Sequence, residues 1–231
     1  MAIRIIENNI LDEYVKRYKL KDMFSIDISE YMYLYRFNKN EYICVENDKL
    51  DNMFFLVDGK AKVYKNLENG KSLLVSFYNP LTIIGDVEFV NGNLADCSVQ
   101  VIKETYCIGI NLNLVRNILM KDCKFLLNIC AYLGEKLSNS SNNNSINLLY
   151  PLENRLASFI LASFNINDNK SMKFTFEESY HEISELLGTS YRHLNRTLNK
   201  FCADEIIQKN GKEYTILNYD KIVYLAGDLY K

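Results

Sequence analysis

The sequence predicts an α+β protein with an N-terminal antiparallel β-roll, a long dimerisation helix and a C-terminal winged helix-turn-helix. Residues 31–112 form short alternating segments separated by turn residues, which is typical of antiparallel sheets. Residues 112–150 return to helical spacing. Residues 181–201 hold two short amphipathic stretches around a glycine, and a hairpin pattern follows them. The predicted domains are residues 1–112, 113–150 and 151–231.

Composition narrows the function. The chain has 231 residues, 48% of them apolar, so it is long enough for two domains. Its net charge of −2 argues against a protein that coats nucleic acid non-specifically. Its six cysteines form no CxxC pair, and we therefore expect no metal and no cofactor. No apolar run approaches the roughly 18 residues of a membrane span, so we expect a cytoplasmic protein without membrane contact. The sequence shows no catalytic set of a nucleophile, a general base and a group that orients the base, so we expect no enzyme activity.

The N-terminal part combines helices with a small sheet domain. Residues 3–30 are expected to form one or two short amphipathic helices. In the sheet region, Asp58-Gly59 and Asn69-Gly70 are predicted hairpin turns. Between them Ala61 and Val63 alternate with lysines, and we expect both to point inward.

A long helix is predicted from Lys121 to Tyr150, about 45 Å if it is unbroken. A helix of that length needs a partner, and a second subunit is the natural one. The Ser/Asn-rich residues 138–147 are poor helix formers, so a hinge there remains the alternative. The expected dimer seam consists of Phe125, Ile129, Leu133 and Leu137.

The helix-turn-helix prediction depends on residues 181–201. Ile183 and Leu187 share one face of the first helix, and Gly188 ends it. Thr189 or Ser190 can cap the second helix by accepting a bond from a free N–H. Leu194, Leu198 and Phe201 then recur at helical spacing and anchor the second helix to the core.

The opposite face of the second helix carries donor-rich side chains that can read base edges or hold phosphates. A solvated helical hairpin has the same periodicity, but the hairpin pattern around Asn210-Gly211, with strands at 206–208 and 214–216, favours a winged helix. His193 is open between a phosphate contact and a packed position. The predicted DNA-binding residues are Thr189, Ser190, Tyr191, Arg192, His193, Asn195, Arg196, Lys200, Lys209 and Lys212.

The order of these parts resembles the Crp/Fnr superfamily of bacterial transcription regulators. The resemblance rests on FFLVDGKAKVYKNLENGKSLL (54–74), IIGDVEFV (83–90), CSVQVIKET (97–105) and HEISELLGTSYRHLNRTLNKF (181–201). SYRHL and PLENRLASFIL are most similar to the YeiL-type branch. The resemblance to this superfamily implies a homodimer that binds double-stranded DNA at a pseudo-palindromic operator and contacts RNA polymerase. It also implies that the affinity for DNA changes when the β-roll senses a signal.

The sequence departs from the family at the effector site. Cyclic-AMP-binding members carry a Glu after the glycine that is Gly85 here, and this chain has Asp86. The Arg that holds the cyclic phosphate is missing, because residues 94–97 supply no cation. We therefore expect a signal other than cyclic AMP, and the sequence leaves open whether a small-molecule effector exists or the pocket is filled by Phe and Tyr side chains. The candidate effector pocket consists of Gly85, Asp86, Glu88, Cys97 and Ser98.

Other family sensors are also disfavoured. The first cysteine is Cys44, so the N-terminal iron-sulfur motif is absent. Both histidines, His181 and His193, lie in the helix-turn-helix and leave the sensor domain without an axial haem ligand. Asn47 replaces a family glycine, and Asn tolerates a positive φ.

The resulting hypothesis is a sequence-specific transcriptional regulator. Tyr191, Arg192 and Arg196 fall where the family reads bases, and Arg192 replaces a Glu that accepts from cytosine in cyclic-AMP-binding members. The alternative is a redox or small-molecule sensor that acts through protein contacts. The sequence leaves open whether any cysteine is redox-active.

Overall fold

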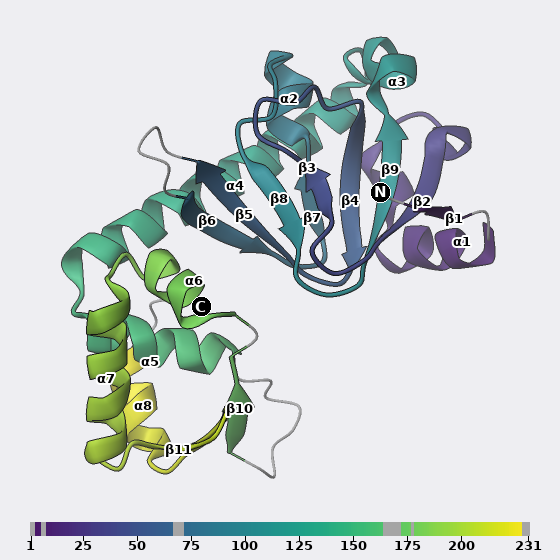
Figure 1. Ribbon diagram of the computed structural model, residues 1–231. Helices are drawn as coiled ribbons and strands as arrows, with labels where there is room; N and C mark the ends of the chain where they lie inside the picture. Colours follow the sequence, from purple (N-terminus) through teal and green to yellow (C-terminus); the bar gives the residue numbers. More distant parts are fainter. Residues whose placement is uncertain (1–2, 6–7, 67–71, 164–171, 177, 228–231) are drawn as a thin grey trace. The chain divides into compact units, whose positions relative to one another are not determined.

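The computed structural model describes residues 3–5, 8–66, 72–163, 172–176 and 178–227 (Figure 1). The chain forms two compact units, residues 1–137 and 138–231, each with its own hydrophobic core. Helix α4 (Cys123–Leu149) begins in the first unit and ends in the second. The division therefore falls inside α4, before Pro151, where the sequence places the boundary of the C-terminal domain. The predicted α+β class is confirmed.

The first unit contains two antiparallel sheets, which are the predicted β-roll (Figure 1). The five-stranded sheet has the order β1-β2-β9-β4-β7, and the four-stranded sheet has the order β3-β8-β5-β6. The strands of the first sheet are β1 (Ile3–Ile5), β2 (Met32–Phe37), β9 (Thr105–Asn111), β4 (Asn52–Asp58) and β7 (Thr82–Ile84). Those of the second are β3 (Tyr42–Cys44), β8 (Ser98–Val101), β5 (Ala61–Asn66) and β6 (Ser72–Tyr78).

The five-stranded sheet is buried on both faces. Phe54 and Leu56 of β4 join one core with Val63 and Val99 of the four-stranded sheet. The alternate residues of β4, among them Phe55, point to a second core that includes residues of the helices. A strand covered on both sides needs an unbroken apolar run, which explains the sequence MFFLV in β4.

Helices cover the second face of this sheet. They are α1 (Asn8–Arg17), the 3-10 helices η1 (Leu20–Met23) and η2 (Ser29–Tyr31), α3 (Leu112–Leu119) and the first half of α4, while α2 (Asp86–Asn91) follows β7. The prediction of helices alone for residues 3–30 is wrong at its start, because Ile3–Ile5 is a strand paired with β2. Three residues are too few for a period of two to be distinguished from a helical one.

Two turn predictions have different outcomes. Asp58-Gly59 is not a hairpin turn, because β4 and β5 belong to different sheets and do not pair. The chain instead changes sheet there, and position 59 requires glycine because its φ is 104° and a Cβ would lie 2.6 Å from the Cα of Thr105. Asn69-Gly70 lies outside the described residues. Asn47 has a φ of 67°, as its replacement of a glycine predicts.

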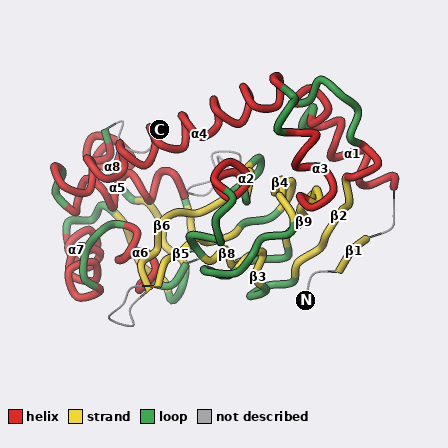
Figure 2. Tube along the Cα trace, turned by 90° about the horizontal axis from the view of Figure 1, so that it is seen from above, coloured by secondary structure: helices red, strands yellow, loops and turns green. Residues whose placement is uncertain are grey.

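Helix α4 is continuous over its 27 residues, and Figure 2 draws it as one uninterrupted helix. The Ser/Asn-rich residues 138–147 are therefore helical rather than a hinge. Asp122 caps its start, since Oδ1 accepts the N–H groups of Lys124 and Phe125 at 3.0 and 3.1 Å. Neither α4 nor any other helix in the described part of the chain is long and apolar enough to cross a membrane.

The second unit is a winged helix. It contains α5 (Leu152–Ser163), β10 (Lys173–Thr175), α6 (Tyr180–Leu186), α7 (Tyr191–Ala203), β11 (Ile207–Asn210), β12 (Glu213–Ile216) and α8 (Tyr219–Ala226). Its sheet has the order β10-β12-β11, so the predicted hairpin gains a third strand. Leu194, Leu198 and Phe201 of α7 are buried in the core of this unit, as their spacing predicts.

Candidate nucleic-acid interface

The turn between α6 and α7 has the predicted geometry. Gly188 has a φ of 57°, and the next N–H, that of Thr189, donates to the Ser184 carbonyl at 2.8 Å. This closes α6 with the bond that a left-handed residue allows. Of the two candidate caps Ser190 is the one used, because its hydroxyl accepts the His193 N–H at 3.2 Å. The two helices are thereby held at a short fixed turn, as DNA-reading helix pairs require.

Helix α7 has one buried and one exposed face. Leu194, Thr197, Leu198 and Phe201 are buried. The exposed residues are Tyr191, Arg192, His193, Arg196, Asn199 and Lys200, and Asn195 is half-buried. His193 is therefore not a packed residue, and its ring nitrogen Nδ1 lies 3.3 Å from the Thr189 hydroxyl.

The basic side chains of α7 differ in their partners. Among the described residues, no hydrogen bond or ion pair holds Arg192 or Arg196. Lys200 instead lies 3.3 Å from Glu153 of α5, with 58% of its side chain exposed. Two guanidinium groups at the N-terminal half of α7 are thus free to meet base edges or phosphates, whereas the ammonium near its C-terminal end already has a counter-ion.

The wing turn is displaced by one residue from the prediction. Asn210 pairs with Glu213, so the loop residues are Gly211 and Lys212, and Gly211 has a φ of 63°. Lys212 lies at the tip and is exposed. Lys209 lies over the rings of Tyr180 and Tyr214, at 5.2 and 5.7 Å from the ring centroids. The wing therefore presents one lysine at its tip and one that is packed on aromatic rings.

Aromatic contacts connect α6, α7 and the wing. The ring of Tyr191, at the start of α7, stacks on His181 of α6 at 5.4 Å. The hydroxyl groups of Tyr180 and Tyr214 share a hydrogen bond. Burial and that bond raise the pKa of Tyr214 above its ordinary value, so the hydroxyl stays protonated. These contacts fix the first residue of the candidate reading helix relative to the wing.

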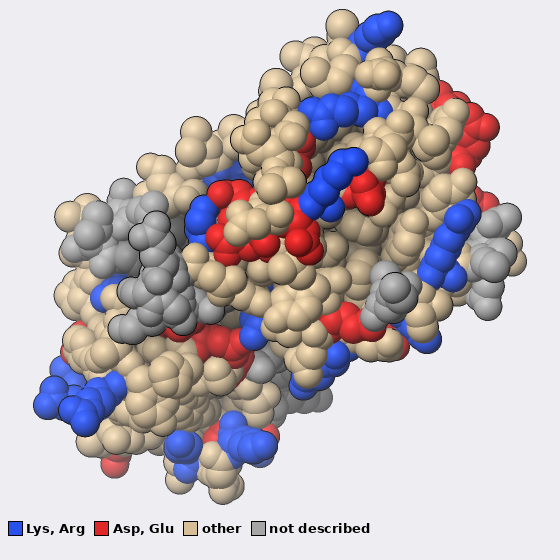
Figure 3. Space-filling view, turned by 45° about the horizontal axis from the view of Figure 1, so that its top comes forward, with Lys and Arg blue, Asp and Glu red and all other residues tan. Residues whose placement is uncertain are grey.

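Basic residues do not form one continuous patch on the face of the protein that Figure 3 shows. Figure 3 shows several separate groups of Lys and Arg, with acidic groups between them. This agrees with the net charge of −2 and means that any nucleic-acid contact is local.

The predicted effector residues lie close together in the β-roll, but their polar groups are already paired. Asp86 is 2% exposed and forms an ion pair with Lys136 of α4, at 3.0 and 3.1 Å to its two oxygens. Glu88 accepts the Asp96 N–H at 3.2 Å, and the buried Ser98 hydroxyl accepts the Glu46 N–H at 3.0 Å. Asp86 thus has a cation as its partner, Lys136, which the sequence did not reveal because it lies 50 residues later in the chain.

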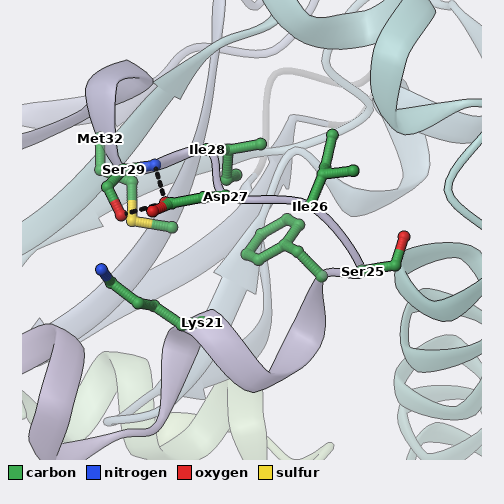
Figure 4. Close-up of a pocket in the computed structure, with 8 residues that line it drawn as sticks. Lys21, Ser25, Ile26, Asp27, Ile28, Ser29 and Met32 are labelled. Carbon is green, nitrogen blue, oxygen red and sulfur yellow. Dashed lines mark hydrogen bonds between the residues drawn. The ribbon is translucent and has the colours of Figure 1, made fainter.

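Two cavities in the first unit lie elsewhere. One, of about 240 Å³, is lined by residues between Lys21 and Met32. Figure 4 shows two of its polar residues joined, since Asp27 accepts bonds from the N–H and hydroxyl of Ser29 at 2.9 and 2.5 Å. The other, of about 320 Å³, lies beside the loop from Cys44 to Asn52. None of the five predicted effector residues lines either cavity.

The predicted dimer seam on α4 requires a correction. Phe125 and Ile129 are fully buried in the core of their own unit, and Leu133 packs partly against it. Leu137 is 72% exposed, as is Leu127. The exposed face instead contains Leu127, Cys130, Gly134 and Leu137, alternately three and four residues apart. For Phe125 and Ile129 the prediction chose the more apolar face of the helix, which the β-roll of the same chain covers, whereas the predicted Leu137 lies on the exposed face.

The cysteines differ in their exposure, and Cys44, Cys97 and Cys202 are half-buried. Cys107 is buried, and burial raises the pKa of its thiol. Burial also raises the pKa of Cys44 to about 12. Cys123 and Cys130 are exposed on α4. Within the part of the chain that the structure describes, no group of three or more Cys, His, Asp or Glu side chains could hold a metal ion.

A β-roll, a long helix and a capped helix-turn-helix with a wing together define a regulator of the Crp type. The cyclic nucleotide-binding domain family matches residues 34–122, and the Crp-like helix-turn-helix domain family matches residues 154–223. The chain belongs to the Crp/Fnr family of transcriptional regulators, as the resemblance predicts.

Individual relatives agree with this assignment. The chain is 32% identical to the regulatory protein YeiL of Escherichia coli O157:H7, over 90% of this chain and 92% of that protein. It is 19% identical to a CRP-like cAMP-activated global transcriptional regulator of Mycobacterium tuberculosis, over 82% and 86%. Among solved structures, the CRP-family regulator TTHB099 of Thermus thermophilus matches with a TM-score of 0.69 and 16% identity, over 84% of this chain and 96% of that one. FixK2 of Bradyrhizobium japonicum matches with a TM-score of 0.66 and 17% identity, over 83% and 96%.

Proposed function

We propose that this protein is a sequence-specific DNA-binding regulator that holds a pseudo-palindromic operator as a homodimer and performs no enzymatic reaction. The observation that carries the proposal is the exposed face of α7, where Arg192 and Arg196 have no partner among the described residues. In such a fold the second helix enters the major groove with its N-terminal residues at the base edges. Reading chromosomal DNA and contacting RNA polymerase place the protein in the cytoplasm.

The candidate DNA-binding residues fall into two groups, those suited to base edges and those suited to phosphates. Arg192, Arg196, Asn195 and Tyr191 are the candidates for base edges, because amide, phenol and guanidinium groups form directed hydrogen bonds. Thr189, Ser190, His193, Lys209 and Lys212 surround them and are the candidates for phosphate contacts. Lys200 is assigned a minor part because Glu153 already neutralises it.

The dimer uses the exposed face of α4. Leu127, Cys130, Gly134 and Leu137 repeat at the spacing of a two-stranded coiled coil, and the small residue Gly134 permits close approach of a second helix. Two copies related by a two-fold axis would present two α7 helices to inverted half-sites about one helical turn apart.

The effector of this regulator is not cyclic AMP. The cation beside Asp86 is Lys136, which is already paired with that carboxylate. Residues 94–97 include no arginine whose guanidinium could bind a cyclic phosphate. A small molecule of another class, or a redox change at the exposed cysteines of α4, is the candidate signal.

The test is selection of random duplex DNA by the purified protein, sequenced after a few rounds, with and without reductant. We expect inverted half-sites about one helical turn apart. Binding must weaken steeply with salt, with a slope near 0.9 per phosphate contact. Recovery of no common sequence under either condition would contradict the proposal and favour the second candidate, a sensor that acts through protein contacts.

A further inference from the structure

Two polar contacts join one turn of α4 to the segment where β7 ends and α2 begins. The hydroxyl of Tyr132 accepts the N–H of Ile83 at 3.0 Å. Four residues later, the ammonium of Lys136 lies 3.0 and 3.1 Å from the two oxygens of Asp86. Residues four apart share a face of a helix, so both contacts point to the β-roll. All four residues belong to the first unit.

The ion pair combines a buried carboxylate with an ammonium group that lies near two aromatic rings. The Asp86 side chain is 2% exposed, and a carboxylate at such a site is costly unless a cation accompanies it. The Lys136 ammonium also lies 5.1 Å from the ring centroid of Tyr78 and 5.7 Å from that of Tyr132. Two aromatic faces and a carboxylate therefore hold one ammonium group in place.

Lys136 lies at the end of the first unit, next to the point where α4 passes into the second unit. The first unit ends at Leu137, one residue later, while α4 continues into the unit that carries the winged helix. Lys136 is thus the last residue at which the β-roll holds α4 by a described polar side-chain contact before the helix leaves the first unit.

We propose that Lys136 is a positioning residue for DNA binding, and that its ion pair with Asp86, here named the Asp86–Lys136 latch, fixes the exit of α4 from the β-roll. The inference rests on the proposed function. An α4 whose exit is fixed has less conformational freedom to lose when the protein binds an operator, so the latch raises operator affinity. The protein's own ammonium thereby closes the β-roll against α4 without any bound molecule.

The chain offers a matched control. Lys65 and Asp96 form a second lysine-aspartate pair in the same unit, 2.6 Å apart, with 41% and 70% of their side chains exposed. This pair joins β5 to the segment before β8 and does not involve α4. Exposed pairs of this kind contribute little to stability.

The experiment measures the affinity of the full-length protein for a labelled duplex that carries the selected operator. We expect Lys136→Met to weaken binding at least tenfold, and Asp86→Asn to weaken it to the same extent. The double variant should lose no more than either single one, because both changes open the same latch. Lys136→Arg should recover affinity to within threefold, and Lys65→Met should stay within twofold of the wild type.

A second measurement separates positioning from loss of folding. The double variant carries a neutral pair and leaves no buried charge alone, so it keeps its fold even if a single variant does not. Hydrogen exchange of the double variant should be faster along α4 and unchanged in α7. Unchanged affinity or exchange in that variant, or an equal loss of affinity in Lys65→Met, overturns the latch while the wild type still binds DNA. A wild type that selects no operator contradicts both proposals.

Discussion

Lys200 of α7 lies 3.3 Å from Glu153 of α5, whereas Arg196, one turn earlier on the same helix, has no partner among the described residues. We expect Arg196→Ala to weaken operator binding by about 1–3 kcal/mol, the loss typical of a base-reading arginine. Lys200→Ala should weaken it less than threefold, because that ammonium is already neutralised. Fluorescence anisotropy over a salt series measures both, with Lys221→Ala on α8 as the control. Equal losses for Arg196 and Lys200 would show that Glu153 does not restrain the lysine.

Arg192 should determine the base at one position of each half-site. Its guanidinium is exposed in the first turn of α7, where a glutamate accepts from cytosine in cyclic-AMP-binding members of the family. We expect Arg192→Ala to relax the preference at that base pair and to leave the other positions unchanged. Selection of random duplexes by both proteins measures this. An identical preference at every position would remove Arg192 from the base-reading set.

The exposed face of α4 should hold two subunits together. Leu127→Glu or Leu137→Glu places like charges opposite each other in the proposed interface, and we expect dissociation to monomers in sedimentation equilibrium. Leu114→Glu on α3 is the control, since Leu114 is also highly exposed but lies outside this face. Phe125→Ala should instead destabilise the β-roll by about 3–5 kcal/mol, because its ring is fully buried there. A dimer that survives both glutamate variants would refute the interface.

Asp122 should stabilise the start of α4 in a pH-dependent way. Burial alone would raise the pKa of this carboxyl, but hydrogen bonds from Ser25 and from the Phe125 and Lys124 amides outweigh it and lower the pKa. The stabilisation is therefore fully present above the unfolded-state pKa of about 3.9 and is lost as the pH falls through the lower folded-state value.

We expect Asp122→Ala to lower the free energy of unfolding by about 2 kcal/mol at pH 7. The difference from the wild type should shrink in urea unfolding below about pH 4. Asp12→Ala, an exposed change on α1, is the control and should have little effect at any pH. A difference that persists unchanged at pH 3 would show that the ionised carboxylate is not the stabilising group.

Thiol reactivity should follow exposure. Cys123 and Cys130 are exposed, whereas Cys107 is buried and the pKa of Cys44 is raised to about 12. Only thiolates react quickly, so we expect iodoacetamide at pH 8 to modify Cys123 before Cys107, and to modify Cys130, which lies on the proposed dimer face, quickly only when Leu137→Glu has separated the subunits. Peptide mass spectrometry gives the order. Modification of Cys107 as fast as Cys123 would mean that the β-roll opens readily.

Local rules in the sequence account for much of the second unit. A glycine at a helix end, a serine before the next helix and three apolar residues at helical spacing predict α6, the turn and α7 because each rule acts over a few residues. Asn210-Gly211 predicts the hairpin for the same reason, although the turn falls one residue later. The short strands β1 and β10 lack such a local pattern, because only their partners in the sheet make them strands.

The sequence by itself determined the fold class, the order of the parts and the exposed face of α7. Periodicity states which side of a helix is apolar, but the tertiary structure decided what covers that side. Phe125 and Ile129 face the β-roll of their own chain, and the less apolar face with Leu127 and Leu137 remains exposed. The tertiary structure likewise decided the partner of Asp86, because burial of a carboxylate selects whichever cation the fold brings within reach, and that cation is Lys136.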